Sequence, residues 1–478
     1  MASFSQPACS FRLLATVTGK RTFEGMAAMK TKIVMIACTL ATLLAMMLGT
    51  GDYAQAKPKN SVTDEGLKAA FVRGGNLWIA IGKTEKQVGQ GSGAQTPRWS
   101  PDGRWVAYAV GEEMKELWLL DVKKDEARRI SANGGSNFQW SPVGGRLAYL
   151  EENKLLWTTV EQGAGSGTGN GNGNEAGEGV GEEARAGSRG GEGSEADVAG
   201  AVEEVGNYGW LPDGSGFIVS SVPRTAPDGW EPIRIGTVRL NQPGQLHPLY
   251  TIPFTTGRNF AIGTGIFKWS SDGRWVAFQA VPTASFSADS NSLCVLSSDG
   301  KRFLRIGYMV RNEAWFKWSP GEARLAFIEG EGREATRNKR MKVVDVPADK
   351  PVVLTPEGYA DRDFAWEGND RIVISRSYES EWTADPAKRP LPYLVLLELR
   401  DRRQSKLTSP PGGFGDFAPA YLPPARLAWV RSDRGDRNRV LLGDDSAQKP
   451  SVWIRKLDKA PSYYEQYFWN SVLDIYSR

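Results

Sequence analysis

The sequence predicts an all-β fold, a β-propeller of four-stranded blades, and three observations carry that prediction. The phrase WSPDGRWVAY at Trp99 returns almost unchanged as WSSDGRWVAF at Trp269. Looser copies, 41 to 70 residues apart, begin at Trp140, Trp210, Trp318, Trp366 and Tyr421. The 478 residues include 54 Gly and 17 Trp, which favours many short strands over long helices. The shortest spacings match one propeller blade, and the longer spacings imply insertions.

Each copy of the phrase encodes a tight turn between two strands. In SPDG at 100–103, proline presets φ, aspartate accepts hydrogen bonds from the backbone that follows, and glycine adopts conformations that other residues resist. Val106 and Tyr108 then alternate as in a strand with one buried face. An apolar strand, ELWLLDV, and a short strand ending in RRIS come next. One unit therefore has four strands.

Eight units are countable from their second strands, which read AAFV, VAYA, LAYL, FIVS, VAFQ, LAFI, IVIS and LAWV. The matching third strands read NLWIAI, ELWLLD, KLLWTT, IGTVRL, SLCVLS, MKVVDV, YLVLLEL and SVWIRKL. Only seven first strands precede them, because the first unit begins at Gly66 without one. The tail, 458–478, supplies either a closing strand or a capping helix. A closing strand would remove the exposed edges of an open ring. We predict eight blades over 66–457, with seven or six as alternatives.

The recurring WSPDG-type phrase, followed by a strand of LW type, resembles the propeller repeat of the TolB-like proteins. The resemblance covers about residues 66–457 and is specific because the phrase recurs at least six times. It implies the propeller fold and an extracytoplasmic setting. Two departures are that the familiar TolB propeller has six blades and that TolB carries an α/β domain before its propeller. The envelope-assembly role of TolB is therefore not carried over.

Residues 1–56 are predicted to be a leader whose signal peptide starts near Met29. A basic start precedes an apolar run at 33–48, and small residues occupy 54–56, as before a peptidase cleavage site. The sixteen apolar residues would span roughly 24 Å as a helix, less than the ~30 Å of the hydrocarbon core. We expect cleavage near Ala56 rather than an uncleaved anchor. The mature chain would then be secreted or extracytoplasmic, without a transmembrane segment.

The segment 161–200 has the composition of a disordered insertion. It is about one-third glycine, with eight acidic and two basic residues and almost no apolar ones. Such a segment buries too little surface to offset the entropy of ordering it. Its glycines lack the strand, helix and lysine of a phosphate-binding loop. We predict a disordered Gly/Glu-rich insertion after the third strand of its unit.

Charge and composition exclude several kinds of chemistry. Without the leader, 54 Lys and Arg face 53 Asp and Glu, which gives no support for nucleic-acid binding. His247 is the only histidine, so a catalytic triad or a His-rich zinc site would depend on it alone. Cys294 is the only cysteine beyond the leader and is predicted to be a small core residue. We predict no catalytic residue, no metal and no cofactor.

The connections between second and third strands suggest where a ligand binds. They are short in the first three units and long in the other five, so one face of the propeller is built up. Binding sites concentrate on loops that a rigid scaffold holds. These connections carry Trp230, Phe286, Tyr378, Trp382 and Arg224. Aromatic residues and arginine are preferred anchors of interfaces, so we predict that these five contact a ligand. In the alternative, they fasten their own loops.

The function that follows is a non-catalytic extracytoplasmic propeller that binds a protein, peptide or glycan of the cell envelope on its long-loop face. The alternative is a propeller-type glycan hydrolase or lyase that uses loop carboxylates such as Glu379, Glu381 and Asp385. A third possibility is a domain of a larger envelope assembly, recognised through the tail. The aspartates of the repeated turns are predicted to form turns rather than to bind metal; they are Asp102, Asp213 and Asp272.

Overall fold

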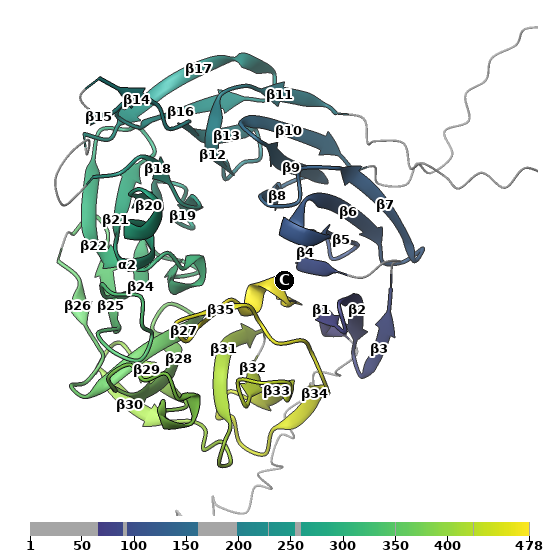
Figure 1. The fold of residues 1–478 in the computed structure, drawn as a ribbon, viewed down its shortest axis with the longest axis vertical. Helices are drawn as coiled ribbons and strands as arrows, with labels where there is room; N and C mark the ends of the chain where they lie inside the picture. Colours follow the sequence, from purple (N-terminus) through teal and green to yellow (C-terminus); the bar gives the residue numbers. More distant parts are fainter. Residues whose placement is uncertain are drawn as a thin grey trace, which may run out of the picture. The chain divides into compact units, whose positions relative to one another are not determined.

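The computed structural model describes residues 66–88, 93–160, 198–227, 229–253, 260–348, 350–423 and 425–477. These residues form eight four-stranded antiparallel blades arranged in a ring, which confirms the predicted all-β propeller (Figure 1). The predicted leader, 1–56, lies outside the described residues, as does the predicted insertion up to residue 197. None of the helices in the described ranges has the length and apolar character needed to cross a bilayer.

Blade 2 shows how the repeated phrase folds. From the inner edge outward it consists of β4 (Ala94–Trp99), β5 (Trp105–Val110), β6 (Glu116–Asp121) and β7 (Glu126–Ser131). Between β4 and β5, the Ser100 hydroxyl donates to Asp102 Oδ1 over 2.5 Å, and the Trp105 amide donates to Ser100 Oγ over 2.9 Å. Gly103 has a φ of 65°, which glycine adopts without strain. The turn is therefore held by its own side chains.

The other blades repeat this order from inner to outer strand. Blade 3 has β8 (Phe138–Trp140), β9 (Arg146–Glu151), β10 (Lys154–Thr159) and β11 (Gly200–Val202). Blade 4 has β12 (Val205–Trp210), β13 (Gly216–Ser221), β16 (Arg234–Arg239) and β17 (Gln242–Thr251). In blade 5, β18 (Gly263–Thr264) and β19 (Lys268–Trp269) share the inner edge, followed by β20 (Trp275–Val281), β21 (Asn291–Ser297) and β22 (Phe303–Met309).

Blades 6 to 8 complete the run. Blade 6 has β23 (Phe316–Trp318), β24 (Arg324–Glu329), β25 (Arg340–Asp345) and β26 (Val352–Val353). Blade 7 has β27 (Tyr359–Glu367), β28 (Arg371–Tyr378), β29 (Tyr393–Glu398) and β30 (Arg403–Lys406). Blade 8 has β31 (Gly415–Leu422), β32 (Arg426–Ser432), β33 (Asn438–Asp444) and β34 (Ser451–Ile454).

Blade 1 is assembled from both ends of the described chain. Its outer strands are β1 (Lys68–Arg73), β2 (Asn76–Ile81) and β3 (Thr84–Gln87), and its inner strand is β37 (Leu473–Tyr476) from the tail. β37 pairs antiparallel with β1 and places Asp474 opposite Ala70. The Asp458 carboxylate accepts hydrogen bonds from the amides of Gly74 and Gly75, at 2.7 and 2.8 Å. The tail thus supplies a strand that closes the ring.

The tryptophans of the repeated phrase connect neighbouring blades. In four blades the indole Nε1–H donates to the carbonyl of the residue that precedes the corresponding tryptophan in the previous blade, a contact that we call the indole bridge. The pairs are Trp140 to Arg98 (3.0 Å), Trp210 to Gln139 (3.1 Å), Trp318 to Lys268 (2.8 Å) and Trp366 to Lys317 (3.0 Å). The buried Nε1 atoms of Trp99 and Trp269 have no hydrogen-bond partner among the described residues.

Apolar side chains between neighbouring blades form the core. One cluster joins blades 5, 6 and 7 around Phe316, Phe327 and Phe364, all fully buried. Another cluster joins blade 8, blade 1 and the tail, and includes Trp469. Because each blade covers a face of the next, no blade can bury its apolar surface alone. Cys294 is fully buried between blades 4 and 5, and burial raises the pKa of its thiol to about 12.

The third strand predicted for the eighth unit is wrong. SVWIRKL, at 451–457, holds the fourth strand, β34, and the third strand is β33. The apolar part of β33 is only Val440, Leu441 and Leu442, between charged residues, so it reads as part of a loop. The connection between second and third strands is therefore 433–437, and the long-loop face is built up over blades 4 to 7 rather than 4 to 8.

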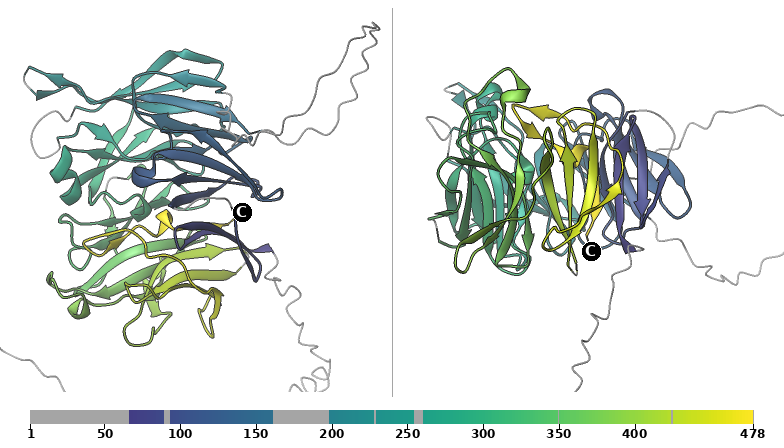
Figure 2. Two further views of the ribbon diagram at one scale, coloured as in Figure 1. Left: turned by 45° about the vertical axis from the view of Figure 1, so that its right-hand side comes forward. Right: turned by 90° about the horizontal axis from the view of Figure 1, so that it is seen from below.

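The long connections and the repeated turns lie at opposite ends of the blades, because successive strands run in opposite directions. We call these the loop end and the turn end. The tail hairpin, β35 (Ser462–Tyr463) and β36 (Gln466–Tyr467), lies at the loop end, while the C-terminus lies at the turn end (Figure 2). The Ala335 amide donates to Tyr464 O over 2.9 Å, which joins the hairpin to the long connection of blade 6.

Replacing Trp140 by phenylalanine should separate the indole bridge from aromatic packing. The change leaves the Arg98 carbonyl without its donor, and we expect the free energy of unfolding to fall by about 1–2 kcal/mol more than in the matched variant Trp269→Phe. Trp269→Phe removes the same ring volume but no hydrogen bond among the described residues. Urea unfolding of both variants measures the difference. Equal losses would show that the bridge adds nothing beyond packing.

Candidate functional site

The five predicted ligand contacts all lie at the loop end of blades 4, 5 and 7. Arg224 and Trp230 belong to a hairpin of β14 (Thr225–Ala226) and β15 (Gly229–Trp230), and Phe286 lies in α2 (Ala284–Asp289). Tyr378 ends β28, and Trp382 lies in the connection that follows. Within the described residues, no hydrogen bond, ion pair or ring contact joins any two of the five. They share a face rather than a single pocket.

Phe286 is the most exposed of these aromatics, and its helix is firmly attached. Its side chain is 69% exposed. At the end of α2, the Asp289 carboxylate accepts two hydrogen bonds from Arg333, at 2.8 and 2.6 Å. Arg333 also donates to the Tyr463 hydroxyl over 3.0 Å. The bidentate ion pair braces the helix that carries this exposed apolar ring, so ordering the ring in an interface would cost little entropy.

Tyr378 is the second exposed aromatic residue, with 62% exposure. Its ring stacks on Tyr359, with centroids 5.0 Å apart and an interplanar angle of 27°. Tyr359 raises the pKa of Tyr378, first through a side-chain hydrogen bond and second through the charge of its own phenol group. Stacking on a neighbouring strand leaves one face of the ring open and holds it in one orientation.

Trp382 fastens its loop instead of standing free. Its ring centroid lies 4.7 Å from that of Tyr464 in the tail hairpin. The guanidinium carbon of Arg389 lies 4.1 Å from the centroid of the Trp382 ring. For Trp382, therefore, the alternative that the aromatic holds its own loop describes the geometry better than ligand contact.

The hairpin of blade 4 carries the remaining two predicted contacts. Trp230 pairs with Thr225 across the hairpin and is half-buried. Arg224 forms an exposed ion pair with Glu204 at 2.5 Å. An exposed pair of this kind contributes little stability and gives way readily to another carboxylate. Arg224 thus remains accessible to an acidic ligand group.

The three loop carboxylates of the enzymatic alternative are engaged in structural contacts. Glu379 pairs with Arg340 at 3.0 Å and accepts the Asn338 amide. Glu381 pairs with Arg337, and Asp385 caps the short helix η5 (Pro386–Lys388) by accepting the Ala387 amide over 3.0 Å. These contacts hold the loops of blades 6 and 7 and give each of the three carboxylates a structural role.

The turn aspartates and the histidine occupy ordinary structural positions. Asp272 accepts the Ser270 hydroxyl at 2.6 Å, as Asp102 does in blade 2. Hydrogen bonds from the Ser215 side chain and amide lower the pKa of Asp213. His247 is exposed on β17. In the described ranges, no group of three or more His, Cys, Asp or Glu side chains is arranged to hold a metal ion.

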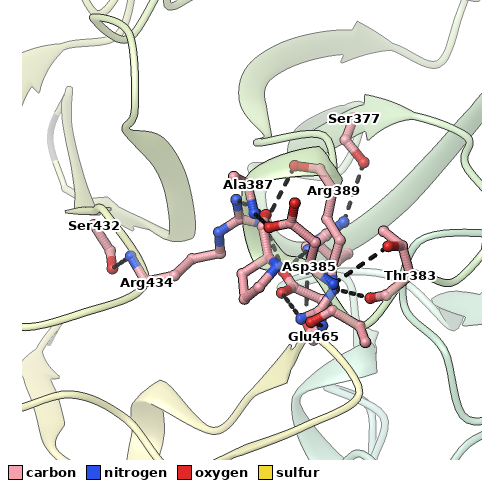
Figure 3. A network of polar contacts seen from close by, with 11 residues as sticks. Ser377, Thr383, Asp385, Ala387, Arg389, Ser432, Arg434 and Glu465 are labelled. Atoms are coloured by element: carbon pink, nitrogen blue, oxygen red, sulfur yellow. Dashed lines mark hydrogen bonds and ion pairs between the residues drawn. The ribbon is translucent and has the colours of Figure 1, made fainter.

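Beneath the loop end lies an arginine cluster that sequence reasoning missed. The Glu465 carboxylate of the tail hairpin is buried and contacts Arg389 at 2.9 Å and Arg434 at 3.3 Å (Figure 3). It also contacts Arg362 at 3.7 Å. Burial lowers the pKa of Arg362, which also donates to Ser377. The three arginines are far apart in the chain and none is marked by a motif. Only the position of the tail brings them to one carboxylate.

A second buried cation organises the long connection of blade 6. Lys339 is fully buried, and its ammonium donates to the carbonyls of Glu331, Gly332 and Arg337, at 3.2, 2.9 and 3.3 Å. Burial lowers the pKa of Lys339 to about 8. The loop thus wraps its backbone around one ammonium group, which fixes the position of Arg333 and Arg337 on the surface.

Three hollows lie along the inner strands. One, of about 490 Å³, is at the turn end and is lined by blades 2 to 5 and the tail. A larger polar hollow of about 620 Å³ faces the loop end and is lined by the same blades, the tail, and Arg311 and Glu313 of the connection to blade 6. A third hollow, of about 220 Å³, is lined by blades 6 to 8 and the tail. Asp474, on the closing strand, lines all three. None of the five predicted contacts lines them.

Comparison with known proteins supports the fold and leaves the activity open. No family model matches the chain. A stretch of 106 residues is 33% identical to the uncharacterized peptidase YuxL of Bacillus subtilis (strain 168), which covers 18% of this chain and 16% of YuxL. The structure of the dihydro-heme d1 dehydrogenase NirN aligns with a TM-score of 0.52 and 12% identity, over 84% of this chain and 76% of NirN. TolB from Acinetobacter baumannii aligns at a TM-score of 0.33 and 14% identity, over 73% and 64%.

Replacing Glu465 by glutamine should loosen the tail hairpin. The change leaves three arginines without their shared carboxylate, and breaking a buried ion pair costs about 3 kcal/mol or more. We expect a matching loss in the free energy of unfolding and faster hydrogen exchange over 462–467. In the control Glu381→Gln the carboxylate is exposed, so the loss should stay below about 1 kcal/mol. Equal losses in the two variants would contradict the clamp.

Lys339 should make stability depend on pH in the alkaline range. Its pKa in the folded chain, about 8, lies below the ordinary 10.5, so between these values the unfolded chain binds more protons than the folded one. Stability from this group therefore rises with pH across that window, by at most about 3 kcal/mol. Denaturant unfolding at pH 7 and pH 10 should show this rise relative to Lys339→Met. A parallel pH dependence in the two proteins would contradict it.

Proposed function

We propose that the chain is an extracytoplasmic propeller that binds a protein, peptide or glycan of the cell envelope at its loop end, without performing catalysis there. The observation that carries the proposal is the pair of exposed aromatic rings, Phe286 and Tyr378, on loops that ion pairs and ring stacking hold in place. Rigid aromatic anchors on an ordered surface are typical of recognition sites. The arrangement of the whole face agrees with this role.

Charge on the same face favours an acidic or hydrogen-bonding ligand. Arg224 is accessible in an exposed ion pair, and Arg337 pairs with the highly exposed Glu381. Such rim charges steer association more than they add affinity. An acidic group on the ligand would exchange with Glu204 or Glu381 at little cost, while the rings supply apolar contact.

The catalytic alternative has less support from the geometry. Glycosidases need two carboxyl groups about 5–9 Å apart with space for a sugar between them. Here Glu379 and Glu381 each pair with an arginine. The Asp385 carboxylate caps a short helix. These contacts give the three carboxylates structural roles, so binding remains the proposed function.

The extracytoplasmic setting is part of the proposal and rests on the sequence. The signal-like segment that begins near Met29 and the TolB-like repeat both favour export. A partner in the cell envelope follows from that setting rather than from a structural feature. The third possibility, recognition through the tail, has less support because the buried Glu465 carboxylate fastens the tail hairpin to arginines of the propeller.

The double variant Phe286→Ala/Tyr378→Ala should lose its partner. We expect recovery from envelope extract by the immobilised variant to fall at least about tenfold, since losing two anchors removes several kcal/mol of binding energy. The control Val143→Ala/Leu246→Ala removes similarly exposed side chains from other surfaces and should keep full recovery.

Extracts treated with protease or with glycosidases identify the ligand class, because only one treatment should abolish recovery. Equal recovery by the double variant and the wild-type chain would reject this placement of the site. Recovery of a ligand that the chain then cleaves would support the catalytic alternative instead.

A further inference from the structure

The hollow at the turn end of the inner strands has aromatic walls. Tryptophans from four successive blades line its 490 Å³, together with a tyrosine from the closing strand: Trp99, Trp140, Trp210, Trp269 and Tyr476. Three prolines of the repeated turns and Phe267 complete the apolar lining. A volume of this size suits a small organic ligand or one side chain of a larger partner. The repeat places these rings side by side because each blade contributes the same position.

One carboxylate provides the charge of this hollow. Asp474 is the only acidic or basic side chain among the described residues that line it. The Trp99 amide donates to Asp474 Oδ2 over 2.7 Å, and no ion pair of Asp474 occurs in the described ranges. Two neighbouring cations donate to backbone carbonyls instead. Arg98 donates to the carbonyls of Pro97 and Asn470, both at 2.7 Å, and Lys68 donates to Gly103 O at 3.0 Å.

A half-buried carboxylate without an ion pair is only partly solvated, which disfavours its charged form. Burial accordingly raises the pKa of Asp474, although the charge of Arg98 opposes the rise. A cationic ligand would provide the missing counter-charge. The aromatic faces would favour the same ligand, since indole and phenol rings attract cations through their quadrupoles. The Lys68 ammonium already lies 5.8 Å from the Trp99 ring and 5.3 Å from the Tyr476 ring.

We propose that this hollow binds an organic ammonium group, with its charge toward Asp474 and its carbon atoms against the tryptophan rings. The group is either a small free amine or the lysine side chain of a peptide, and both present the same chemistry. The site lies at the turn end, whereas the proposed recognition of envelope ligands uses the loop end. The two inferences therefore stand or fall separately.

Calorimetric titration of the full chain with matched probes tests the charge requirement. Choline and butylammonium represent free amines, and N-acetyl-lysine amide represents the peptide source. The neutral isostere of choline, 3,3-dimethyl-1-butanol, has the same shape without the charge, and glucose represents a glycan. We expect the ammonium probes to bind at least about tenfold more tightly than the neutral isostere, a difference of about 1.4 kcal/mol. The stronger of choline and the lysine probe identifies the source.

Two variants locate the site. Asp474→Asn keeps an acceptor for the Trp99 amide and removes the charge, so choline affinity should fall about tenfold or more. Trp269→Leu removes one ring face without breaking an indole bridge and should cost about fivefold, within the range of a cation–π contact. The control Asp363→Asn changes a buried carboxylate that lines the hollow of blades 6 to 8, and its choline affinity should stay unchanged. Circular dichroism confirms that each variant is folded.

Three results would overturn the proposal. These are the absence of ammonium binding to the folded chain, equal binding of choline and its neutral isostere, and unchanged choline affinity in folded Asp474→Asn. Binding of glucose in preference to the ammonium probes would assign the hollow to a sugar and would equally reject it.

Discussion

The structure depends on the fact that each blade must be covered by its neighbours, so the ring has to close. The indole bridge makes this dependence local, because four tryptophans of the repeat each donate to the inner strand of the previous blade. Where the bridge is missing, other contacts join the inner strands. Asp474 accepts the Trp99 amide between blades 1 and 2, and the Asn207 side chain donates to the Gly265 carbonyl between blades 4 and 5. Closure itself rests on β37, which brings the chain end to β1 and buries both edges.

Features that depend on neighbouring residues in the chain were predictable, and features that depend on closure were not. The Ser-x-Asp-Gly turn holds itself through its own side chains, so the repeated phrase predicts strands, turns and blade number. In blade 8 the third strand has only three apolar residues between charges, and local pattern gave the wrong assignment. The site around Glu465 carries no signal at all, because its arginines come from three separate segments and meet only after the tail has crossed the loop end.

The same limit applies to the aromatic residues of the loops. Phe286 and Trp382 look equivalent in the sequence, since both are large aromatics in long polar connections. The structure gives them different surroundings. The tail hairpin brings Tyr464 into contact with Trp382, whereas Phe286 lies on a helix whose last residue, Asp289, is bound by Arg333. Whether a loop aromatic serves the fold or faces solvent is therefore decided by a segment roughly fifty to eighty residues away in the chain, which no local pattern contains.

Closing the ring with the tail also determines the electrostatics of its interior. The inner strands of blades 2, 5 and 6 place Arg98, Lys268 and Lys317 before their tryptophans, and each donates to backbone carbonyls. The corresponding position of the closing strand is Asp474, the one such position that carries an acid. A closing strand with a neutral residue there would leave the aromatic hollow uncharged and suited to any apolar ligand. Because β37 brings a carboxylate, the strand that completes the fold also gives that hollow its preference for positive charge.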